Sequence, residues 1–295
     1  MKELKGLELD KLLKEKVSDN IEANGKIDID SIDLYLKQFI EKKAVLGFDI
    51  YQYSQFAPLK QNLIPHLFKK LYSTTIKNCL DNEDFFLQYK SKTEFENKLI
   101  DTGDGGFQIF DTPLEALIFS IYFQANIVRY NSGNKNLSDL YNLIGEINLR
   151  YSLTYDNIYN YKNNFYGPAI INCARIMSKD KLNRFLIDNN SIVWFNSEIN
   201  SLETCMLFDP IIDFPTIPIF KSKFDKKTYK SILFSTTNGN KIRCLDILKI
   251  GEIKSRLDSL SIFSIHLQVS FTSDGKAFKK YGITLGNLNS SGLAD

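Results

Sequence analysis

The run Ala44-Val-Leu-Gly-Phe-Asp-Ile50 decides the fold, because a short apolar segment of this length is typical of a buried β-strand. It continues into Tyr51-Gln-Tyr-Ser-Gln-Phe56, and Pro58 then opens a helical pattern that extends to Ile76. Asp49 lies at the end of the strand. A strand followed closely by a long helix indicates a mixed domain of strands and helices.

The next segment, residues 95–110, has two strand-like halves around a glycine-rich turn. Gly103-Asp-Gly-Gly106 predicts a β-hairpin, since Asp-Gly supplies the positive φ angles that hairpin turns need. Thr112-Pro-Leu-Glu115 predicts the start of a second helix, with Thr112 as the cap and Glu115 completing a capping box.

Apolar and polar residues alternate from Ile147 to Thr154, which predicts a half-buried strand. The order up to this point is strand, helix, strand, turn, strand, helix, strand. We therefore predict an α+β fold of the ferredoxin-like type. Gly167-Pro168 predicts a further helix, and residues 184–187 and 192–195 predict two further strands.

We divide the chain into three parts. Residues 1–40 carry a broken helical pattern and are interpreted as an N-terminal helical arm for packing or dimerisation. Residues 41–200 form the central domain. Residues 201–295 form a strand-rich C-terminal extension of unknown role, which either extends the sheet or makes a small sensor region. Its predicted strands lie at 217–225, 231–235 and 267–282, with a turn at 273–275.

The composition excludes several classes of protein. A net charge of +2 argues against a broad nucleic-acid surface. No run reaches the roughly 18 apolar residues of a membrane span, and the charged start lacks the apolar core of a signal peptide. The cysteines (Cys79, Cys173, Cys205 and Cys244) are far apart, which indicates free thiols. His66 and His266 are isolated and are not interpreted as ligands. We expect a cytoplasmic protein that binds neither nucleic acid nor membrane.

The chemistry depends on two carboxylates. In the split β-α-β order the first strand lies beside the hairpin, so Asp49 and Asp104 can point at one place. Close carboxylates repel one another unless a cation lies between them, and two Mg²⁺ or Mn²⁺ ions would serve. Backbone amides of residues 51–54 are candidates to hold phosphate oxygens, and Gly105 and Gly106 leave room for a ligand. Each feature alone is also typical of an ordinary turn or cap.

Three blocks, in order, resemble the catalytic domain of class III adenylate and guanylate cyclases. They are Gly47-Phe-Asp-Ile-Tyr-Gln-Tyr-Ser54, Ile100-Asp-Thr-Gly-Asp-Gly-Gly-Phe-Gln-Ile-Phe110 and Phe165-Tyr-Gly-Pro-Ala-Ile-Ile-Asn-Cys-Ala-Arg-Ile-Met177. The resemblance covers roughly residues 44–190. It implies that residues 41–200 are a nucleotidyl cyclase domain, which closes a nucleoside triphosphate into a 3′,5′-cyclic nucleotide and releases pyrophosphate.

The resemblance also implies roles for single residues. Asp49, Asp104 and the carbonyl of Ile50 would bind two divalent metal ions. Arg175 would stabilise charge on the α-phosphate, with Asn172 as a second catalytic residue. The metals and the arginine come from different subunits in this family, so the resemblance implies a homodimer with shared active sites.

This sequence departs from the family at three positions. The family's asparagine position holds Ile171, and Asn172 follows one residue later. The two positions that read adenine through a Lys/Asp pair hold Ile100 and Asn164, so the chain does not resemble an adenylate cyclase. A guanine-reading Glu is also absent from position 100.

The remaining pattern resembles the bacterial Pycsar antiphage cyclases, which make cUMP or cCMP for a downstream effector. We expect a pyrimidine substrate, UTP slightly before CTP. Tyr51, Tyr53 or Tyr166 would narrow the pocket, and Ser54 would lie beside the nucleotide. The phosphate-binding lysine is open among Lys241, Lys249 and Lys254.

Three alternatives remain. One is an adenylate or guanylate cyclase of ordinary second-messenger signalling. Another is an inactive cyclase-homology module that binds nucleotide. The last is a diguanylate-type enzyme, which shares the sheet topology but has a different hairpin sequence.

Overall fold

The structure is a computed structural model that describes residues 36–83, 90–133, 137–161, 164–198, 241–254, 259–272 and 280–287, with short pieces at 3–4, 11, 14, 34, 87, 289 and 291–293. Its strands are β1 (Glu3–Leu4), β2 (Glu41–Ile50), β3 (Leu99–Asp101), β4 (Gly105–Phe110), β5 (Leu149–Tyr161), β6 (Asn164–Tyr166), β7 (Phe185–Asp188), β8 (Lys241–Lys254), β9 (Ser259–Thr272) and β10 (Lys280–Leu285). Its helices are η1 (Tyr53–Gln55), α3 (Pro58–Asn82), α4 (Lys92–Asn97), α5 (Pro113–Asn131), α6 (Ser138–Ile144), α7 (Pro168–Lys179) and α8 (Asn189–Glu198).

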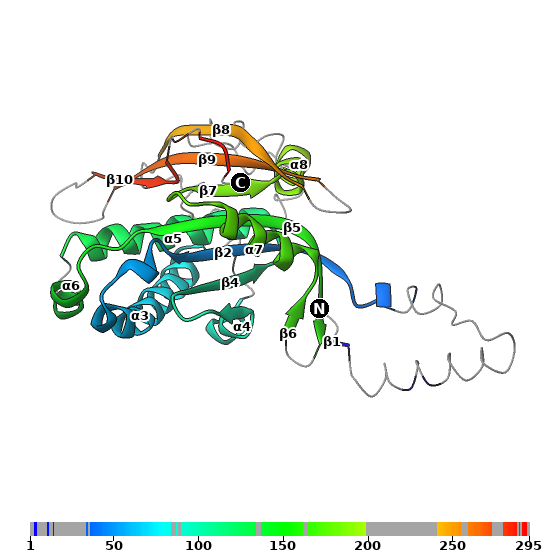
Figure 1. Ribbon diagram of the computed structural model, residues 1–295, viewed down its shortest axis with the longest axis horizontal. Coiled ribbons are helices and arrows are strands. Elements are labelled where there is room, and N and C mark those ends of the chain that lie inside the picture. The colour runs from blue at the N-terminus through cyan, green and yellow to red at the C-terminus, as the bar shows by residue number, and fades with distance from the viewer. Residues whose placement is uncertain are drawn as a thin grey trace, which may run out of the picture.

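The predicted ferredoxin-like arrangement is confirmed. Strand β2 lies at the centre and pairs antiparallel with β4 on one side and with β5 on the other. The neighbouring strands run in the order β5-β2-β4-β3. Helix α3 connects β2 to the hairpin and α5 connects the hairpin to β5, which is the split β-α-β connectivity (Figure 1).

The two faces of this sheet are covered differently. Phe48 points to the face covered by α3 and α5, where its ring lies 5.8 Å from that of Phe68 and 5.2 Å from that of Phe123, measured between centroids. Val45 points the other way and packs with Cys173 of α7. Because side chains alternate along a strand, Asp49 shares the face of Val45.

The local signals for helix starts are confirmed. The side chain of Thr112 accepts a hydrogen bond from the amide of Glu115, and Pro113 opens α5. Pro168 opens α7, after Gly167 with a φ of 133°. The hairpin turn differs from prediction, since Gly103 is its one residue with positive φ and Asp104 is not left-handed. The turn therefore needs the conformational freedom of glycine at position 103 and not at position 104.

Two other predictions are corrected. Residues 192–195 were predicted as a strand and lie in helix α8. The carboxylate of Asp188 caps the start of that helix, because it accepts hydrogen bonds from both the amide and the hydroxyl of Ser191. The polar side of β5 was predicted to face outward, but α7 covers it, so Ser152 and Thr154 are fully buried.

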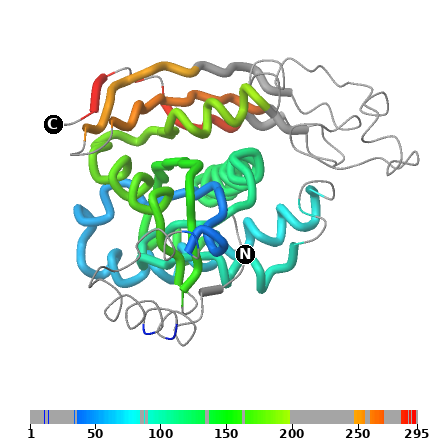
Figure 2. Tube along the Cα trace, turned by 90° about the vertical axis from the view of Figure 1, so that its right-hand side faces the viewer, coloured from blue at the N-terminus to red at the C-terminus, as the bar shows by residue number. Residues whose placement is uncertain are grey.

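The late strands join the same sheet. Strand β9 pairs with β7, which pairs in turn with β5, and β8 and β10 both pair with β9 (Figures 1 and 2). The predicted strand at 267–282 is thus partly confirmed by β9 and β10. The predictions at 217–225, 231–235 and 273–275, and most of those at 1–40, lie outside the described residues. In the described part of the chain, no helix has both the length and the hydropathy needed to cross a bilayer.

Candidate active site

The structure brings Asp49 and Asp104 together. Asp49 pairs with Gly105 across β2 and β4, and the amide of Ile50 donates a hydrogen bond of 3.1 Å to the carbonyl of Asp104. Gly105 permits this approach, since a Cβ there would lie 2.1 Å from the carbonyl oxygen of Phe48. The space at Gly105 is therefore used by strand β2, and not by a ligand as the sequence had indicated.

The electrostatics of Asp104 reflect this proximity. Burial raises the pKa of Asp104 above its ordinary value of 3.8, and the negative charge of Asp49 raises it further. Arg150 opposes the rise, as does a backbone hydrogen bond. The two carboxylates therefore interact electrostatically. Within the described residues, Asp104 forms no ion pair.

Arg150 is the residue that the sequence analysis missed. Arg150 lies opposite Asp49 on β5, and its guanidinium forms a bidentate ion pair with the Asp49 carboxylate. Nε donates to Oδ1 at 2.6 Å and Nη2 donates to Oδ2 at 2.7 Å. The register between β2 and β5 creates this pair, so only a prediction of strand pairing would have found it. The hydrogen bonds to Asp49 raise the pKa of Arg150, which stays charged.

Arg150 also connects this site to the end of α7. Its Nη1 donates to the carbonyl of Asp180, the residue that caps the helix. The carboxylate of Asp180 accepts hydrogen bonds from Nε and Nη2 of Arg184, whose side chain is buried. Arg184 also donates to the carbonyl of Ser291. A continuous chain of polar contacts therefore runs from Asp49 to residue 291.

Arg175 and Asn172 lie on the outer side of α7, half-buried, and contact each other. Nη1 of Arg175 donates to Oδ1 of Asn172 at 3.3 Å. Within the described residues of one chain, Arg175 forms no ion pair with Asp49 or Asp104. Ile171, on the same helix, is 58% exposed. The helix thus presents a guanidinium and an apolar side chain outward.

The residues after β2 are partly occupied by structural contacts. The amide of Tyr51 donates to the carbonyl of Asn148, so it is not free to bind phosphate. The hydroxyl of Tyr51 donates to the carbonyl of Lys181. The ring of Tyr53 packs against the core and its hydroxyl donates to the carbonyl of Gln61, while Ser54 is exposed in η1.

The positions expected to read the base lie on different strands. Ile100 pairs with Phe107 in the β3–β4 hairpin, and Asn164 is exposed where β6 pairs with the far end of β5. No strand pairing joins β3 to β6 within the chain. Tyr166 is 42% exposed and stacks on Tyr159, with ring centroids 5.6 Å apart.

The donor atoms fit a divalent cation that also takes oxygen ligands from a phosphate. Asp49 and Asp104 lie next to each other at the ends of β2 and the hairpin turn, and their charges interact. Mg²⁺ in nucleotide sites is commonly held by one or two carboxylates plus the substrate phosphates. Over the described ranges, no cluster of three or more His, Cys, Asp or Glu side chains offers a closed metal cage. An open site shared with substrate is the arrangement that this donor set allows.

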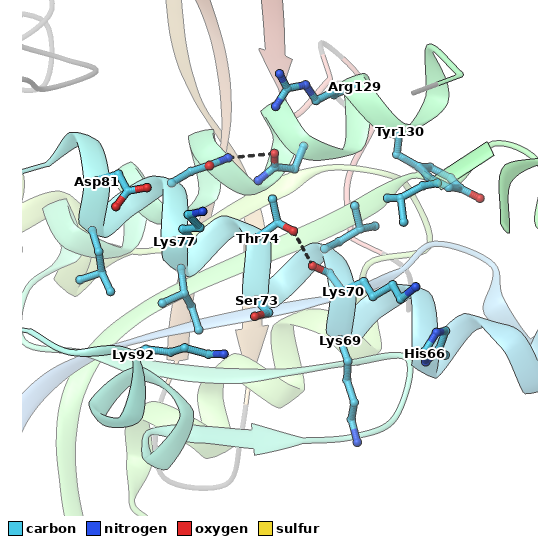
Figure 3. A pocket seen from close by; sticks show the side chains of 16 residues that line it. His66, Lys69, Lys70, Ser73, Thr74, Lys77, Asp81, Lys92, Arg129 and Tyr130 are labelled. Atoms are coloured by element: carbon cyan, nitrogen blue, oxygen red, sulfur yellow. Dashed lines mark hydrogen bonds between the residues drawn. The ribbon is translucent and has the colours of Figure 1, made fainter. Parts of the chain in front are cut away.

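A separate basic groove of about 810 Å³ lies over the outer surface of α3. Figure 3 shows its cationic side chains on both sides of that helix. They are Lys69, Lys70, Lys77, Lys92 and Arg129, and Asp81 is the one acid among the lining residues. Because α3 covers the face to which Phe48 points, the groove lies across the sheet from Asp49. It is not part of the acid site.

Comparison with known proteins gives structural neighbours only. No protein-family model and no curated protein matches this sequence. The chain is similar to the guanylyl cyclase Cya2, with 11% identity over 77% of this chain and 92% of that one and a TM-score of 0.39. For the adenylyl cyclase CyaB from P. aeruginosa the values are 9%, 81%, 98% and 0.37. For the guanylyl cyclase domain of the RhoGC fusion protein from the aquatic fungus Blastocladiella emersonii they are 11%, 76%, 96% and 0.42. With TM-scores below 0.5, these likenesses leave the function to be argued from the chain's own residues.

Proposed function

We propose that this protein is a nucleotidyl cyclase, which converts a nucleoside triphosphate into a 3′,5′-cyclic nucleotide and pyrophosphate. The observation that carries the proposal is the convergence of Asp49 and Asp104 at the ends of β2 and the hairpin turn. Asp49 and Asp104 are 55 residues apart in the sequence, so their proximity comes from the pairing of β2 with β4 and not from local structure.

The chain's residues would divide the work as follows. Asp49, Asp104 and the carbonyl of Ile50 would hold two divalent cations, Mg²⁺ or Mn²⁺. When bound, these ions would neutralise the triphosphate and make the 3′-hydroxyl more acidic. The amides of Gln52, Tyr53 and Ser54 would orient the phosphate chain.

Arg175 would act on a site formed with a second copy of the chain. Arg175 is half-buried, its guanidinium donates to Asn172, and within the described residues it forms no ion pair with either acid of its own chain. A homodimer that places the arginine of one copy opposite the acids of the other would let it stabilise negative charge on the α-phosphate.

The substrate is proposed to be a pyrimidine nucleotide, UTP slightly before CTP. Support comes from Ile100 and Asn164, which lack the charged groups that would read a purine edge, and from Tyr51, which directly follows β2. The cyclic nucleotide would act in the cytoplasm as an antiphage signal to a downstream effector. Ordinary cAMP or cGMP signalling is the alternative.

The Asp49–Arg150 pair favours a second candidate function. A carboxylate gripped at 2.6 and 2.7 Å by a guanidinium has both oxygens engaged. A protein that keeps this pair permanently would bind nucleotide without turning it over, as an inactive cyclase-homology module.

Product analysis separates these functions. The purified protein is incubated with ATP, GTP, CTP and UTP separately, with Mn²⁺, and products are identified by mass spectrometry. The proposal predicts cUMP or cCMP with pyrophosphate. Robust cAMP with negligible pyrimidine products would overturn the substrate class, and no cyclic product from any nucleotide would favour the inactive module.

Mixing two inactive variants tests the shared site. Asp104→Asn and Arg175→Ala should each be inactive alone. Random exchange of subunits would give half heterodimers, each with one intact site, and so about a quarter of wild-type activity. No recovery, in a mixture shown by mass spectrometry to contain heterodimers, would place the acids and the arginine in the same subunit.

A further inference from the structure

The acid site already contains one cation, and it belongs to the protein. Arg150 binds Asp49 through two nearly equal hydrogen bonds, at 2.6 and 2.7 Å. The two side chains are 25% and 19% exposed, so the pair is partly shielded from water. A bidentate guanidinium lies in the plane of the carboxylate and occupies the space from which a metal ion would approach both oxygens.

The pair leaves the site with surplus negative charge. Asp49, Asp104 and Arg150 together carry two carboxylates and one guanidinium, and within the described residues Asp104 has no cationic partner at ion-pair distance. A divalent cation that enters while Arg150 stays in place would meet a positive charge within a few ångströms. At that range unit charges interact by several kcal/mol even at an effective dielectric constant near 20.

Arg150 has a second place to bind. Its Nη1 already donates to the carbonyl of Asp180 at the end of α7. Carbonyls at a helix C-terminus carry partial negative charge and attract cations. Asp180 itself is held by Arg184, through bonds of 2.9 and 2.7 Å to its carboxylate, so this acceptor is fixed.

We propose that Arg150 is a resident counter-cation that exchanges with the metal: it neutralises Asp49 in the metal-free protein and must leave that carboxylate before a divalent cation can bind. Arg150 is thus a positioning residue that weakens metal binding in the absence of nucleotide. The exchange leaves the guanidinium on the Asp180 carbonyl, next to the helix that carries Arg175. This inference deepens the proposed function and takes from it only the identity of the cation.

Metal binding without nucleotide tests the exchange directly. Free Mn²⁺ is measured by electron paramagnetic resonance, and the heat of binding by calorimetry, for the wild type, Arg150→Gln and Arg150→Lys. Removing the competing charge should tighten Mn²⁺ binding by about tenfold or more in Arg150→Gln. Arg150→Lys keeps the positive charge but loses the bidentate geometry of the guanidinium. Its affinity for Mn²⁺ should therefore fall between those of the wild type and Arg150→Gln. Arg129→Gln, on the far side of the sheet, is the matched control and should bind Mn²⁺ as the wild type does.

The direction of the change separates this role from a structural one. Loss of a purely structural contact would weaken Mn²⁺ binding or leave it unchanged. Either result, seen in both Arg150→Gln and Arg150→Lys as folded proteins, would overturn the proposal. The double variant Asp49→Asn/Arg150→Gln should lose the gain, because the competition is for Asp49. If Arg150→Gln does not fold, judged by circular dichroism, Arg150→Lys carries the test.

The outcome is independent of turnover. Tighter Mn²⁺ binding in Arg150→Gln, with no cyclic product from any of the four nucleotides, would support the counter-cation and reject the enzyme. Cyclic product from the wild type, with unchanged Mn²⁺ affinity in both Arg150 variants, would do the reverse.

Discussion

Two pairs of acids lie at opposite ends of the β2–β4 ladder, and they are neutralised differently. Beyond the end of β4, Asp111 binds Lys43 at 3.0 Å and Lys90 at 2.7 Å, and Glu115 also binds Lys90. At the other end, Arg150 binds Asp49, and within the described residues Asp104 forms no ion pair. The first pair has a lysine for each carboxylate, whereas the second has one cation for two.

The difference indicates which pair is structural. The Asp111–Glu115 pair stabilises the start of α5, since Glu115 also accepts a hydrogen bond from the amide of Asp111. Burial alone would raise the pKa of Asp111, but hydrogen bonds from Lys90 and Lys43 and the charges of Lys90 and Lys98 lower this pKa well below its ordinary value. An acid pair with incomplete neutralisation in a half-buried position is the better candidate for binding a cation.

The largest expected effect comes from neutralising one acid of each pair. Asp104→Asn should lower cyclisation by about a thousandfold or more, because metal-ion stabilisation of charge is worth several kcal/mol. Asp111→Asn is the matched variant, and its turnover per folded molecule should equal that of the wild type. Its free energy of unfolding should fall by about 1 kcal/mol, since the site is partly exposed. Product yield measures turnover, and urea denaturation measures the free energy of unfolding. Equal losses of turnover in Asp104→Asn and Asp111→Asn would contradict the distinction between a cation-binding and a structural acid pair.

Lys90→Met should destabilise the protein by about 3 to 5 kcal/mol, because it leaves the buried carboxylate of Glu115 without its ammonium partner. The side chains of Lys90 and Glu115 are both only 11% exposed. Lys92→Met is the matched control, because its pair with Glu96 is exposed and worth under about 0.5 kcal/mol. Urea denaturation at pH 7 compares them, and similar losses for the two variants would contradict a special role for Lys90.

Asp188 tests the comparison with a buried carboxylate that has hydrogen bonds but no cation in the described structure. Burial raises its pKa from 3.8 to about 6, against hydrogen bonds from Ser191 and the amide of Tyr155 that lower it. The folded state therefore holds the proton more tightly than the unfolded state. The stabilising contribution of this group is complete below pH 3.8 and is lost as the pH rises through about 6.

The expected size of this loss is up to about 3 kcal/mol between pH 4 and pH 7. Asp188→Asn cannot titrate, so the free energy of unfolding of the wild type minus that of the variant should decrease over this range. Urea denaturation at a series of pH values gives the difference. A difference that stays constant or grows with pH would reverse the sign.

Gly47→Ala probes the strand between the two acid pairs and has the smallest expected effect. An added Cβ would lie 2.6 Å from Sδ of Met177 and 2.8 Å from Sγ of Cys173, so α7 must shift. Overpacking of this kind costs about 2 kcal/mol. Gly251→Ala is the control, since its Cβ would meet nothing closer than 3.7 Å. Equal melting temperatures for the two variants would show that α7 shifts away from position 47 without a loss of stability.

The sequence predicted the central sheet because its signals are local. The apolar run at 44–50 and the caps at Thr112 and Gly167 each specify one element, and the order of elements restricts the topology. The meeting of Asp49 and Asp104 followed from that topology. Whether they bind metal, and whether Arg175 serves a partner's site, stay predictions.

Of the two features that the sequence analysis missed, one depends on a contact between distant segments and the other on a local signal that was misinterpreted. The Asp49–Arg150 pair needs the register of β2 against β5, which alternation alone does not set. Residues 192–195 are β-branched or aromatic, and both types are enriched in strands, so they were predicted as a strand. The cap from Asp188 to Ser191 starts a helix there, and this cap was visible in the sequence as an acid three residues before a serine.

The contact between Arg184 and Ser291 bears on how the protein is handled in the laboratory. Shortening the chain before residue 291 would remove the carbonyl that accepts from a fully buried guanidinium. The same arginine holds Asp180, whose carbonyl holds Arg150. A truncation that removes residue 291 therefore acts only a few polar contacts away from Asp49.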